Sequence, residues 1–366
     1  PAGLSKKKLI KLARKRFQKG EDDDKPMDGR VVVITGAAGG IGSELCQTLY
    51  SLGSTVIALD RNTNGLMDLK KSLQTTDDKR LLTFTTHHED LASVSAVADQ
   101  IKTSFPNIDV LVNNAGLAYS QDLIPGSPGM VSAHGKDLAF TVNYLSHVLL
   151  TEKLLDNLSN TNGRIVHLTS TFHYKVDGKE LLPPLDGSDP IALRVEPEEQ
   201  GPKHVARSYA NTKLAQIWHS RSIQAPNCKS VCACPTWAAT GIAGEEGRDF
   251  LGNYGFPIAN CGPGITSALN AILRTDDELG DALDDGNSFV ANSRIVEYIW
   301  GLNVWLVNSF GLRDILTDAL AIILLIGQRY THDEFIIQQT SPESYNDEDK
   351  RKKFYQWSLK EIQPWL

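Results

Sequence analysis

The sequence predicts an α/β protein with a doubly wound parallel sheet of about seven strands and a helical apolar insert near the C-terminus. Two observations support this fold class. From Arg30 onward, short runs rich in β-branched residues alternate with amphipathic stretches, as in parallel strands joined by crossover helices. The chain has 366 residues, of which 41% are hydrophobic, so it can bury a sizeable core.

The predicted elements follow one another along the chain. The expected strands are Val31–Thr35, Thr55–Asp60, Leu81–Thr86, Val110–Asn113, Arg164–Thr169, Ser230–Cys234 and Ser288–Ala291. Helices are expected near residues 41–52, 91–104, 137–158, 206–224 and 263–274, where apolar residues recur at three- and four-residue steps. Residues 171–205 contain five prolines, which indicates a long surface excursion. We divide the chain into an N-terminal extension (1–28), the sheet domain (29–293), the apolar insert (294–333) and a C-terminal tail (334–366).

The N-terminal extension is strongly basic. Residues 1–20 contain eight Lys or Arg and no acid, and four acidic residues follow at 21–24. Apolar residues recur at helical spacing, at Leu9, Leu12, Ala13 and Phe17. Three interpretations stay open. The segment is a solvated tail, or an amphipathic helix that docks on an anionic membrane surface or a partner, or the remnant of a targeting segment, because the chain opens at Pro1 and the segment is acid-poor.

The composition excludes some classes of protein. A formal charge of -7 and a pI near 5.7 argue against a general nucleic-acid binder, because phosphate binding requires a basic surface. The five cysteines include no Cys-x-x-Cys pair, so we expect neither a disulfide framework nor a metal site. Cys232 and Cys234 alternate with apolar residues and should be small buried hydrophobes. An intracellular, reducing compartment fits this cysteine usage.

A glycine-rich loop carries the first chemical signal. Residues Thr35 to Gly42 read Thr-Gly-Ala-Ala-Gly-Gly-Ile-Gly between the first strand and the first helix, which is the context of a dinucleotide-binding loop. Glycines let the backbone approach the pyrophosphate, whose charge is received by the helix N-terminus. Asp60 ends the second strand, where a carboxylate can accept hydrogen bonds from the adenosine ribose. NAD(H) is therefore favoured, while the neighbouring Arg61 leaves NADP(H) open because it could offset the charge of a 2′-phosphate.

Two further motifs make the identification more specific. Asn113-Asn114-Ala115-Gly116 follows the fourth strand, and Tyr209-Ala210-Asn211-Thr212-Lys213 lies on a predicted helix. With the glycine-rich loop, and in this order, they resemble the short-chain dehydrogenase/reductase family over residues 30–292. The resemblance implies the Rossmann fold and a nicotinamide-dependent oxidoreductase. The implied catalytic residues are Ser170, Tyr209, Lys213 and Asn143. The implied cofactor contacts are Thr35, Gly36, Gly40, Ile41, Gly42, Asp60, Arg61, Asp90, Leu91, Asn113, Ala115, Gly116, Tyr209, Lys213, Pro235 and Thr240.

The family pattern also assigns roles to these positions. It implies that Asp90 hydrogen-bonds the adenine, that Thr240 holds the nicotinamide carboxamide, and that Asn143 holds a water that relays protons outward. The physical argument stands beside the resemblance. Tyr209 and Lys213 are four residues apart and share a helix face. A free phenol has a pKa near 10, and we expect the ammonium and an oxidised nicotinamide to favour the phenolate. Lys213 would also bind the nicotinamide ribose, while the serine would steady the charge that develops on the substrate oxygen.

Two departures from the family pattern shape the substrate expectation. Pro235 is followed by Thr236 where the family has glycine, and the interval between Ser170 and Tyr209 is long. A long insert at this point is similar to the retinol-dehydrogenase-like branch and to protochlorophyllide reductases, both of which act on large lipophilic molecules. Trp237 stands where the pigment reductases carry a cysteine, so the retinol-dehydrogenase side is favoured.

The apolar insert 294–333 has no counterpart in either group. Charged residues interrupt it, so no uncharged run reaches the roughly 18 residues of a membrane span. It is either a helical addition folded onto the substrate loop or a surface that docks on a membrane or a partner. The expected function is hydride transfer to or from a lipophilic alcohol or ketone. The alternatives are a protochlorophyllide-type reductase and a non-catalytic cofactor-binding subunit of a larger membrane-associated assembly, and a plastid or mitochondrial location stays open.

Overall fold

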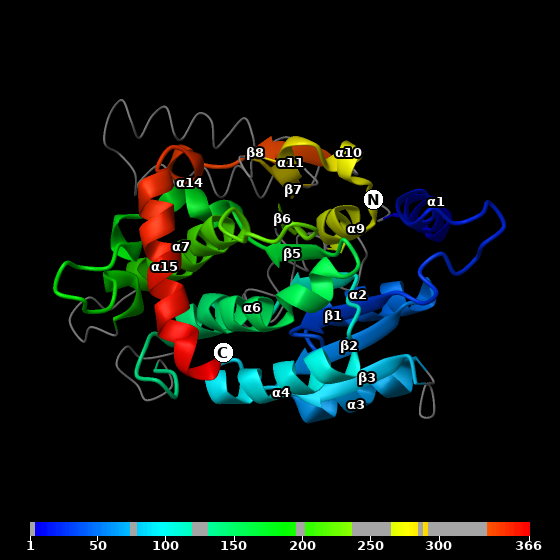
Figure 1. Cartoon of the computed structure of the whole chain (residues 1–366), viewed down its shortest axis with the longest axis horizontal. Coiled ribbons are helices and arrows are strands. Elements are labelled where there is room, and N and C mark those ends of the chain that lie inside the picture. Colours follow the sequence, from blue (N-terminus) through cyan, green and yellow to red (C-terminus); the bar gives the residue numbers. More distant parts are fainter. Residues whose placement is uncertain are drawn as a thin grey trace.

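The computed structural model describes residues 4–73, 79–118, 131–194, 202–235, 265–284, 288–291 and 335–366. In these residues the chain forms one sheet of strand order β3-β2-β1-β4-β5-β6-β7-β8, with helices on both faces (Figure 1). The strands are β1 (Val31–Thr35), β2 (Thr55–Asp60), β3 (Leu81–Thr85), β4 (Val110–Asn113), β5 (Arg164–Leu168), β6 (Lys229–Ala233), β7 (Ser288–Ala291) and β8 (Ile336–Gln339). The neighbouring strands from β3 to β7 are parallel. The predicted doubly wound sheet is therefore confirmed, with each predicted strand within one residue of its expected bounds.

The eighth strand lies in the segment that the sequence presented as a C-terminal tail. β8 runs antiparallel to β7, with Ile337 opposite Val290 and Ile336 opposite Ala291. Its four residues are Ile-Ile-Gln-Gln, which is too short a pattern to indicate a strand by itself. Pairing covers the edge that β7 would otherwise expose, so the tail is part of the sheet domain.

The helices on the two faces follow the predicted alternation. They are α1 (Lys6–Phe17), α2 (Gly40–Ser51), α3 (Thr63–Ser72), α4 (Leu91–Ser104), α5 (Leu138–Phe140), α6 (Ser146–Ser159), α7 (Pro202–Ser220), α9 (Thr266–Leu273), α10 (Asp276–Leu279), α11 (Asp281–Asp284), α14 (Pro342–Tyr345) and α15 (Glu348–Ile362). A π-helical turn, Thr141–Leu145, joins α5 to α6, so the predicted helix 137–158 is not regular throughout. The sequence did not indicate α3 or α15.

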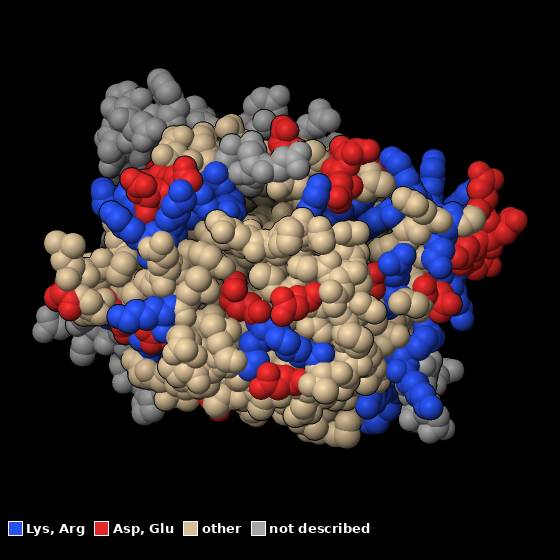
Figure 2. Space-filling view, in the orientation of Figure 1, with Lys and Arg blue, Asp and Glu red and all other residues tan. Residues whose placement is uncertain are grey.

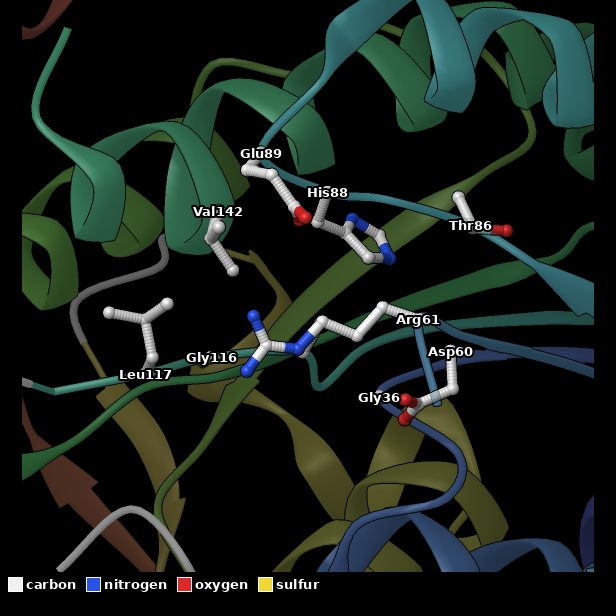
Figure 3. Close-up of a pocket in the computed structure, with 10 residues that line it drawn as sticks. Gly36, Asp60, Arg61, Thr86, His88, Glu89, Gly116, Leu117 and Val142 are labelled. Carbon is white, nitrogen blue, oxygen red and sulfur yellow. The ribbon is translucent and has the colours of Figure 1, made fainter. Parts of the chain in front are cut away.

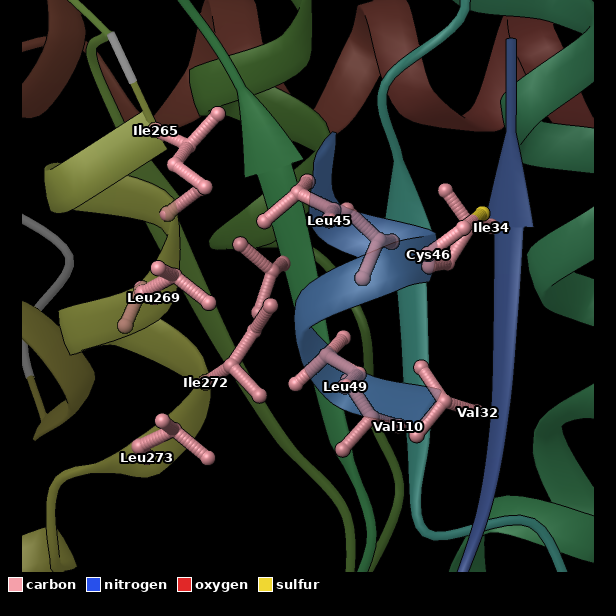
Figure 4. Packing of buried hydrophobic residues seen from close by; sticks show 14 of the residues in the cluster. Val32, Ile34, Leu45, Cys46, Leu49, Val110, Ile265, Leu269, Ile272 and Leu273 are labelled. Atoms are coloured by element: carbon pink, nitrogen blue, oxygen red, sulfur yellow. The ribbon is translucent and has the colours of Figure 1, made fainter. Parts of the chain in front are cut away.

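One face of the sheet is covered by α2 and α9. Leu45 and Leu49 of α2 and Leu269 of α9 are fully or almost fully buried and belong to one apolar cluster with residues of β1 and β4 (Figure 4). Each such side chain contributes about 1.5–3 kcal/mol to folding by leaving water. This layer fixes the start of α2 against the end of β1, which is where the glycine-rich loop lies.

The other face is covered by α4, α6 and α7, and α15 packs over α6 and α7. Phe354 of α15 is fully buried, with its ring centroid 5.1 Å from that of Tyr144 and 5.8 Å from that of Trp218. The Tyr144 hydroxyl is also 2.9 Å from the hydroxyl of Ser358. The C-terminal segment is thus an integral part of the core rather than an appended tail.

The N-terminal helix packs on its own domain. Leu9, Leu12 and Ala13 of α1 are buried in the cluster that contains α9, and Ser5 caps the helix by accepting a hydrogen bond from the Lys8 amide at 3.3 Å. The solvated-tail interpretation is therefore wrong for this helix. Lys6, Lys7, Lys11 and Lys15 remain exposed, and Figure 2 shows Lys and Arg gathered over this region beside an acidic group.

The remaining expectations fall on different parts of the chain. The described part of the proline-rich excursion, residues 171–194, forms three short 3-10 turns, and Leu181 and Leu193 are buried. Cys46, Cys228, Cys232 and Cys234 are buried, as was expected for Cys232 and Cys234. The apolar insert 294–333 lies outside the described residues. Among the described helices, none combines the length and apolarity that a membrane span requires.

Candidate active and cofactor-binding site

The glycine-rich loop is shaped by close backbone contacts at the carboxyl end of β1. Gly36 has a φ of +65°, and a Cβ atom there would lie 2.9 Å from the Ala115 Cα. A Cβ on Gly42 would lie 2.1 Å from the Gly36 carbonyl oxygen. Among the described residues, no side chain caps the N-terminus of α2, which begins at Gly40. The amides of its first turn can therefore receive an anionic group.

Thr35 and the Asn-Asn-Ala-Gly turn hold this loop in place. The Thr35 hydroxyl accepts hydrogen bonds from the amides of Asn114 (2.9 Å) and Ala115 (2.8 Å). The Asn114 side-chain amide donates back to the carbonyls of Thr35 (2.7 Å) and Gly36 (3.2 Å). Asn113 is fully buried and donates to the Thr151 hydroxyl at 3.1 Å. Thr35 and Asn113 thus support the cradle through buried hydrogen bonds. Asn114, which the sequence presented only as part of the turn motif, fixes the loop directly.

Asp60 stands where the sequence predicted it, at the end of β2. One carboxylate oxygen accepts from the Ala38 amide at 2.9 Å and the other accepts from the Asn62 amide at 2.8 Å. A small cavity of about 110 Å³ opens beside it (Figure 3). The cavity is lined by Gly36, Asp60, Arg61, Thr86, His88, Glu89, Ala115, Gly116, Leu117 and Val142. Figure 3 shows the Arg61 side chain extending into it between His88 and Leu117.

Asp90 and Leu91 lie at the start of α4, after β3, and neither is among the residues that line the cavity. Asp90 is the N-cap of α4: its carboxylate accepts from the Ala92 amide at 3.0 Å and lies 3.5 Å from the His134 ring. Leu91 is fully buried in the core. The loop residues that line the cavity are instead Thr86, His88 and Glu89. Asp90 thus caps its helix through one carboxylate oxygen, and its implied contact with the adenine stays a prediction.

Ser170, Tyr209 and Lys213 converge as predicted. Ser170 follows β5, and its hydroxyl lies close enough to the Tyr209 hydroxyl to oppose the rise in the pKa of that phenol. Tyr209 and Lys213 lie on one face of α7, with the Lys213 Nζ 5.2 Å from the centroid of the Tyr209 ring. The Phe172 ring meets the Tyr209 ring edge-on at 5.6 Å, which fixes the direction of the phenol. A serine hydroxyl, a phenol and an ammonium thus share one site at the carboxyl end of the sheet.

Burial controls the protonation of this group in the absence of a cofactor. Burial raises the pKa of Tyr209 above its ordinary value, although the nearby Ser170 hydroxyl opposes the shift. Burial also lowers the pKa of Lys213 to about 8. The ammonium donates to the Leu168 carbonyl at 2.8 Å and to the Gln216 Oε1 at 3.1 Å. The protein alone therefore keeps the phenol protonated because of burial, and the positive charge of an oxidised nicotinamide would favour the phenolate.

Asn143 lies in the π-helical turn, close to the site, but its groups are already bonded. Its side-chain amide donates to the Leu117 carbonyl (2.9 Å) and the Thr212 hydroxyl (3.1 Å), and its Oδ1 accepts from the Leu117 amide at 2.8 Å. Its backbone carbonyl accepts from the Gln216 Nε2 at 2.8 Å and contacts the His147 Nδ1 at 3.0 Å. A carbonyl oxygen has two lone pairs, and Gln216 and His147 occupy both lone pairs of the Asn143 carbonyl, where a relay water would otherwise bind.

The remaining cofactor positions divide into three groups. Ile41 is half-buried and packs against the core, and Gly116 lines the cavity. Pro235 follows β6 at the same end of the sheet. Thr240 and Trp237 lie outside the described residues, so the implied contact of Thr240 with the carboxamide stays a prediction.

These residues fit a nicotinamide dinucleotide. The loop from Gly36 to Gly42 leaves a cradle that a Cβ would fill, and the uncapped α2 amides face it. Asp60 and Arg61 line the adjoining cavity and would meet the adenosine half. Ser170, Tyr209 and Lys213 form the reactive end. Bound there, such a cofactor would supply or accept the hydride.

Comparison with known proteins agrees with this geometry. Residues 30–177 match the family model for short chain dehydrogenase. Human retinol dehydrogenase 13 is 33% identical over 153 residues, which are 40% of this chain and 42% of that protein. The chloroplastic short-chain dehydrogenase TIC 32 A of Brassica napus is 28% identical over 198 residues, which are 52% of this chain and 56% of that protein. The chain spans about half the length of the curated relatives that it matches.

One solved structure matches across nearly the whole fold. It is the crystal structure of an uncharacterized protein from Mycobacterium paratuberculosis, with a TM-score of 0.57 and 21% identity. The match covers 92% of this chain and 94% of that one, and it shows the fold alone. The matched sequence of residues 30–177 and the three motifs placed at one end of the sheet make this chain similar to the short-chain dehydrogenase/reductase family.

Proposed function

We propose that this protein is a nicotinamide-dependent oxidoreductase that transfers a hydride between the cofactor and a lipophilic alcohol or ketone. The observation that carries the proposal is the convergence of Ser170, Tyr209 and Lys213 beside a glycine cradle that fits a dinucleotide. A serine or tyrosine alone at such a position has many structural roles. The two hydroxyls close together, with a buried ammonium alongside, are the arrangement that acid–base chemistry at a carbonyl requires.

The side chains divide the work of reduction between them. The Tyr209 phenol, held protonated by burial, donates its proton to the substrate oxygen as that oxygen gains charge. The Ser170 hydroxyl donates a second hydrogen bond to the same oxygen and stabilises the charge. Lys213 keeps two donors on Leu168 and Gln216 and has its third available for a ribose hydroxyl. The reverse reaction passes the proton from the alcohol to the phenolate.

NAD(H) is the proposed cofactor, with NADP(H) as the alternative. The Asp60 carboxylate lines the cavity, and a 2′-phosphate there would meet like charge. Titration of the protein with NADH and with NADPH, followed by nucleotide fluorescence, tests the preference. We expect NADH to bind at least tenfold more tightly, and Asp60→Asn to reduce that ratio at least tenfold. Tighter binding of NADPH to the parent would assign the second cofactor instead, with Arg61 as the phosphate partner.

The proposal of a lipophilic substrate rests on the resemblance to the retinol-dehydrogenase-like branch and on the long segment between Ser170 and Tyr209. The test is a screen of retinoid, steroid and pigment carbonyls with NADH, followed by Tyr209→Phe on the best substrate. Loss of the phenol should lower kcat by about 10²- to 10⁴-fold and leave the NADH dissociation constant within twofold. Tyr355→Phe is the matched control, because the Tyr355 hydroxyl bonds Glu152 on α6, far from the site. Parent turnover in Tyr209→Phe would refute the proposed function.

Surface docking is a second proposal, supported by the N-terminal helix. Because the apolar face of α1 is buried, attraction to an anionic lipid surface would come from exposed lysines, among them Lys6, Lys7 and Lys11. Such attraction is worth about 1 kcal/mol per lysine. Sedimentation with anionic vesicles should fall in the triple glutamine variant and at high salt. Equal sedimentation with uncharged vesicles would leave residues 294–333 as the proposed docking segment. A plastid location is also proposed, on the similarity to the chloroplastic relative.

A further inference from the structure

Gln216 lies one helical turn after Lys213 on the same face of α7 and is almost fully buried, with 1% of its surface exposed. Its Oε1 accepts a hydrogen bond from the Lys213 ammonium at 3.1 Å, and its Nε2 donates to the Asn143 carbonyl at 2.8 Å. The opposite orientation of the amide would set its NH₂ group against the ammonium and its oxygen against the carbonyl. The chemistry of the two partners therefore fixes which way this amide points.

The second lone pair of the Asn143 carbonyl is taken by His147. A carbonyl oxygen only accepts, so the proton of this bond must be on the His147 Nδ1, which donates to it at 3.0 Å. The Nε2 of the neutral ring is then an acceptor and lies 3.0 Å from the Thr35 hydroxyl, whose single proton is also within reach of the Val112 carbonyl at 3.3 Å. With Gln216 as the other donor, this carbonyl is saturated.

The Lys213 ammonium has no anionic partner among the described residues. The titratable groups that face it are Tyr209 on its own helix, Cys232 and Cys234 at the end of β6, His167 on β5 and His147 on α6. Burial keeps Tyr209 protonated, raises the pKa of Cys232 to about 12 and lowers the pKa of His167 to about 3. The positive charge is therefore held by two neutral acceptors, the Leu168 carbonyl and the Gln216 amide.

We infer that Gln216 is a positioning residue that stands in the place of a relay water, tying Lys213 to Asn143 through its side-chain amide. This inference rests on the proposed function for its catalytic meaning. Two fixed donors orient the third N–H of the ammonium toward the cofactor ribose. An amide does not pass protons as a water does, so the Asn143 carbonyl fixes the lysine and does not relay its proton.

The test compares Gln216→Leu and Gln216→Glu with the parent in cofactor-free protein. The titration of Lys213 is followed by NMR of protein labelled with ¹³C at lysine Cε, and Lys213→Met identifies the resonance. Gln216→Leu removes an acceptor and should lower the Lys213 midpoint by at least one pH unit. Gln216→Glu supplies an anion and should raise it by at least one pH unit. Asn211→Leu removes another buried amide of α7, one that bonds Glu180, and should leave the midpoint unchanged.

The second readout is NADH binding and steady-state kinetics. Gln216→Leu should weaken NADH about tenfold and move the pH limb of kcat/KM in the direction of the NMR shift. A Lys213 midpoint that is the same in the parent, Gln216→Leu and Gln216→Glu would overturn the inference, whether or not the protein is active. Shifted midpoints in a protein that reduces no carbonyl would refute the proposed function and leave the role of Gln216 intact. If Gln216→Leu does not fold, the Lys213 midpoint in the isosteric Gln216→Glu variant decides the question alone.

Discussion

The substitution Gly42→Ala tests whether the glycine-rich loop is set by backbone packing. A Cβ at this position would lie 2.1 Å from the Gly36 carbonyl oxygen and 2.9 Å from the Asn114 Nδ2. Real Cβ contacts are essentially never shorter than 3.0 Å, so the loop or α2 must move by roughly 1 Å. Neither can move freely, because Asn114 bonds the carbonyls of Thr35 and Gly36.

Overpacking of this kind costs about 1–3 kcal/mol. If the strain stays in the folded protein, Tm should fall by roughly 2–12 °C. If the free protein relieves it by opening the loop, the cost moves to cofactor binding, and the NADH dissociation constant should rise about 5- to 150-fold. Differential scanning fluorimetry measures Tm, and NADH titration of the same sample measures the dissociation constant.

Gly39→Ala is the matched control. It lies in the same loop with a φ of −78°, and its added Cβ would stand at an ordinary 3.4 Å from the Gly36 oxygen. It should change Tm by no more than about 2 °C, so it controls for backbone strain and not for cofactor affinity. A Gly42→Ala protein that matches the parent in both Tm and NADH affinity would refute the reasoning, because the packing that defines the cradle would then be dispensable.

Two further predictions concern stability. Arg164 is 2% exposed and donates to the carbonyls of Ala271 (2.8 Å) and Arg274 (2.7 Å) besides its ion pair with Asp276, so Arg164→Leu should lower the free energy of unfolding by about 3 kcal/mol. Guanidinium denaturation checks this, and a loss below about 1 kcal/mol would contradict it. Five buried histidines have lowered pKa values: His88 (about 4), His173 (about 4), His167 (about 3), His147 and His219. In the unfolded chain these histidines bind protons near pH 6.5, whereas in the folded protein they stay neutral there. Their contribution to the free energy of unfolding is therefore fully present above pH 6.5 and is lost as the pH falls below it. The loss should be on the order of 1 kcal/mol per histidine by pH 5.5, and an unfolding free energy that is flat from pH 7.5 to 5.5 would be the opposite result.

The sequence by itself determined the sheet and the identity of the reactive groups. Parallel strands buried on both faces have an apolar run that is visible locally, and the loop glycines are required by the backbone at their own positions. The four-residue spacing of Tyr209 and Lys213 likewise places them on one face of any helix. These properties depend on neighbours along the chain, which is why they could be predicted.

The tertiary structure alone decided how polar groups are partnered and which apolar faces are covered. Asp90 caps its helix, and Gln216 and His147 fill the Asn143 carbonyl. These outcomes depend on competition between donors and acceptors that come from remote segments. In the same way, α1 packs against α9, and Phe354 of α15 joins a core whose other helices and strands lie more than 120 residues earlier in the chain. A hydrogen-bond partner or a buried face is fixed only when the fold brings distant residues within contact, and no local pattern carries that information.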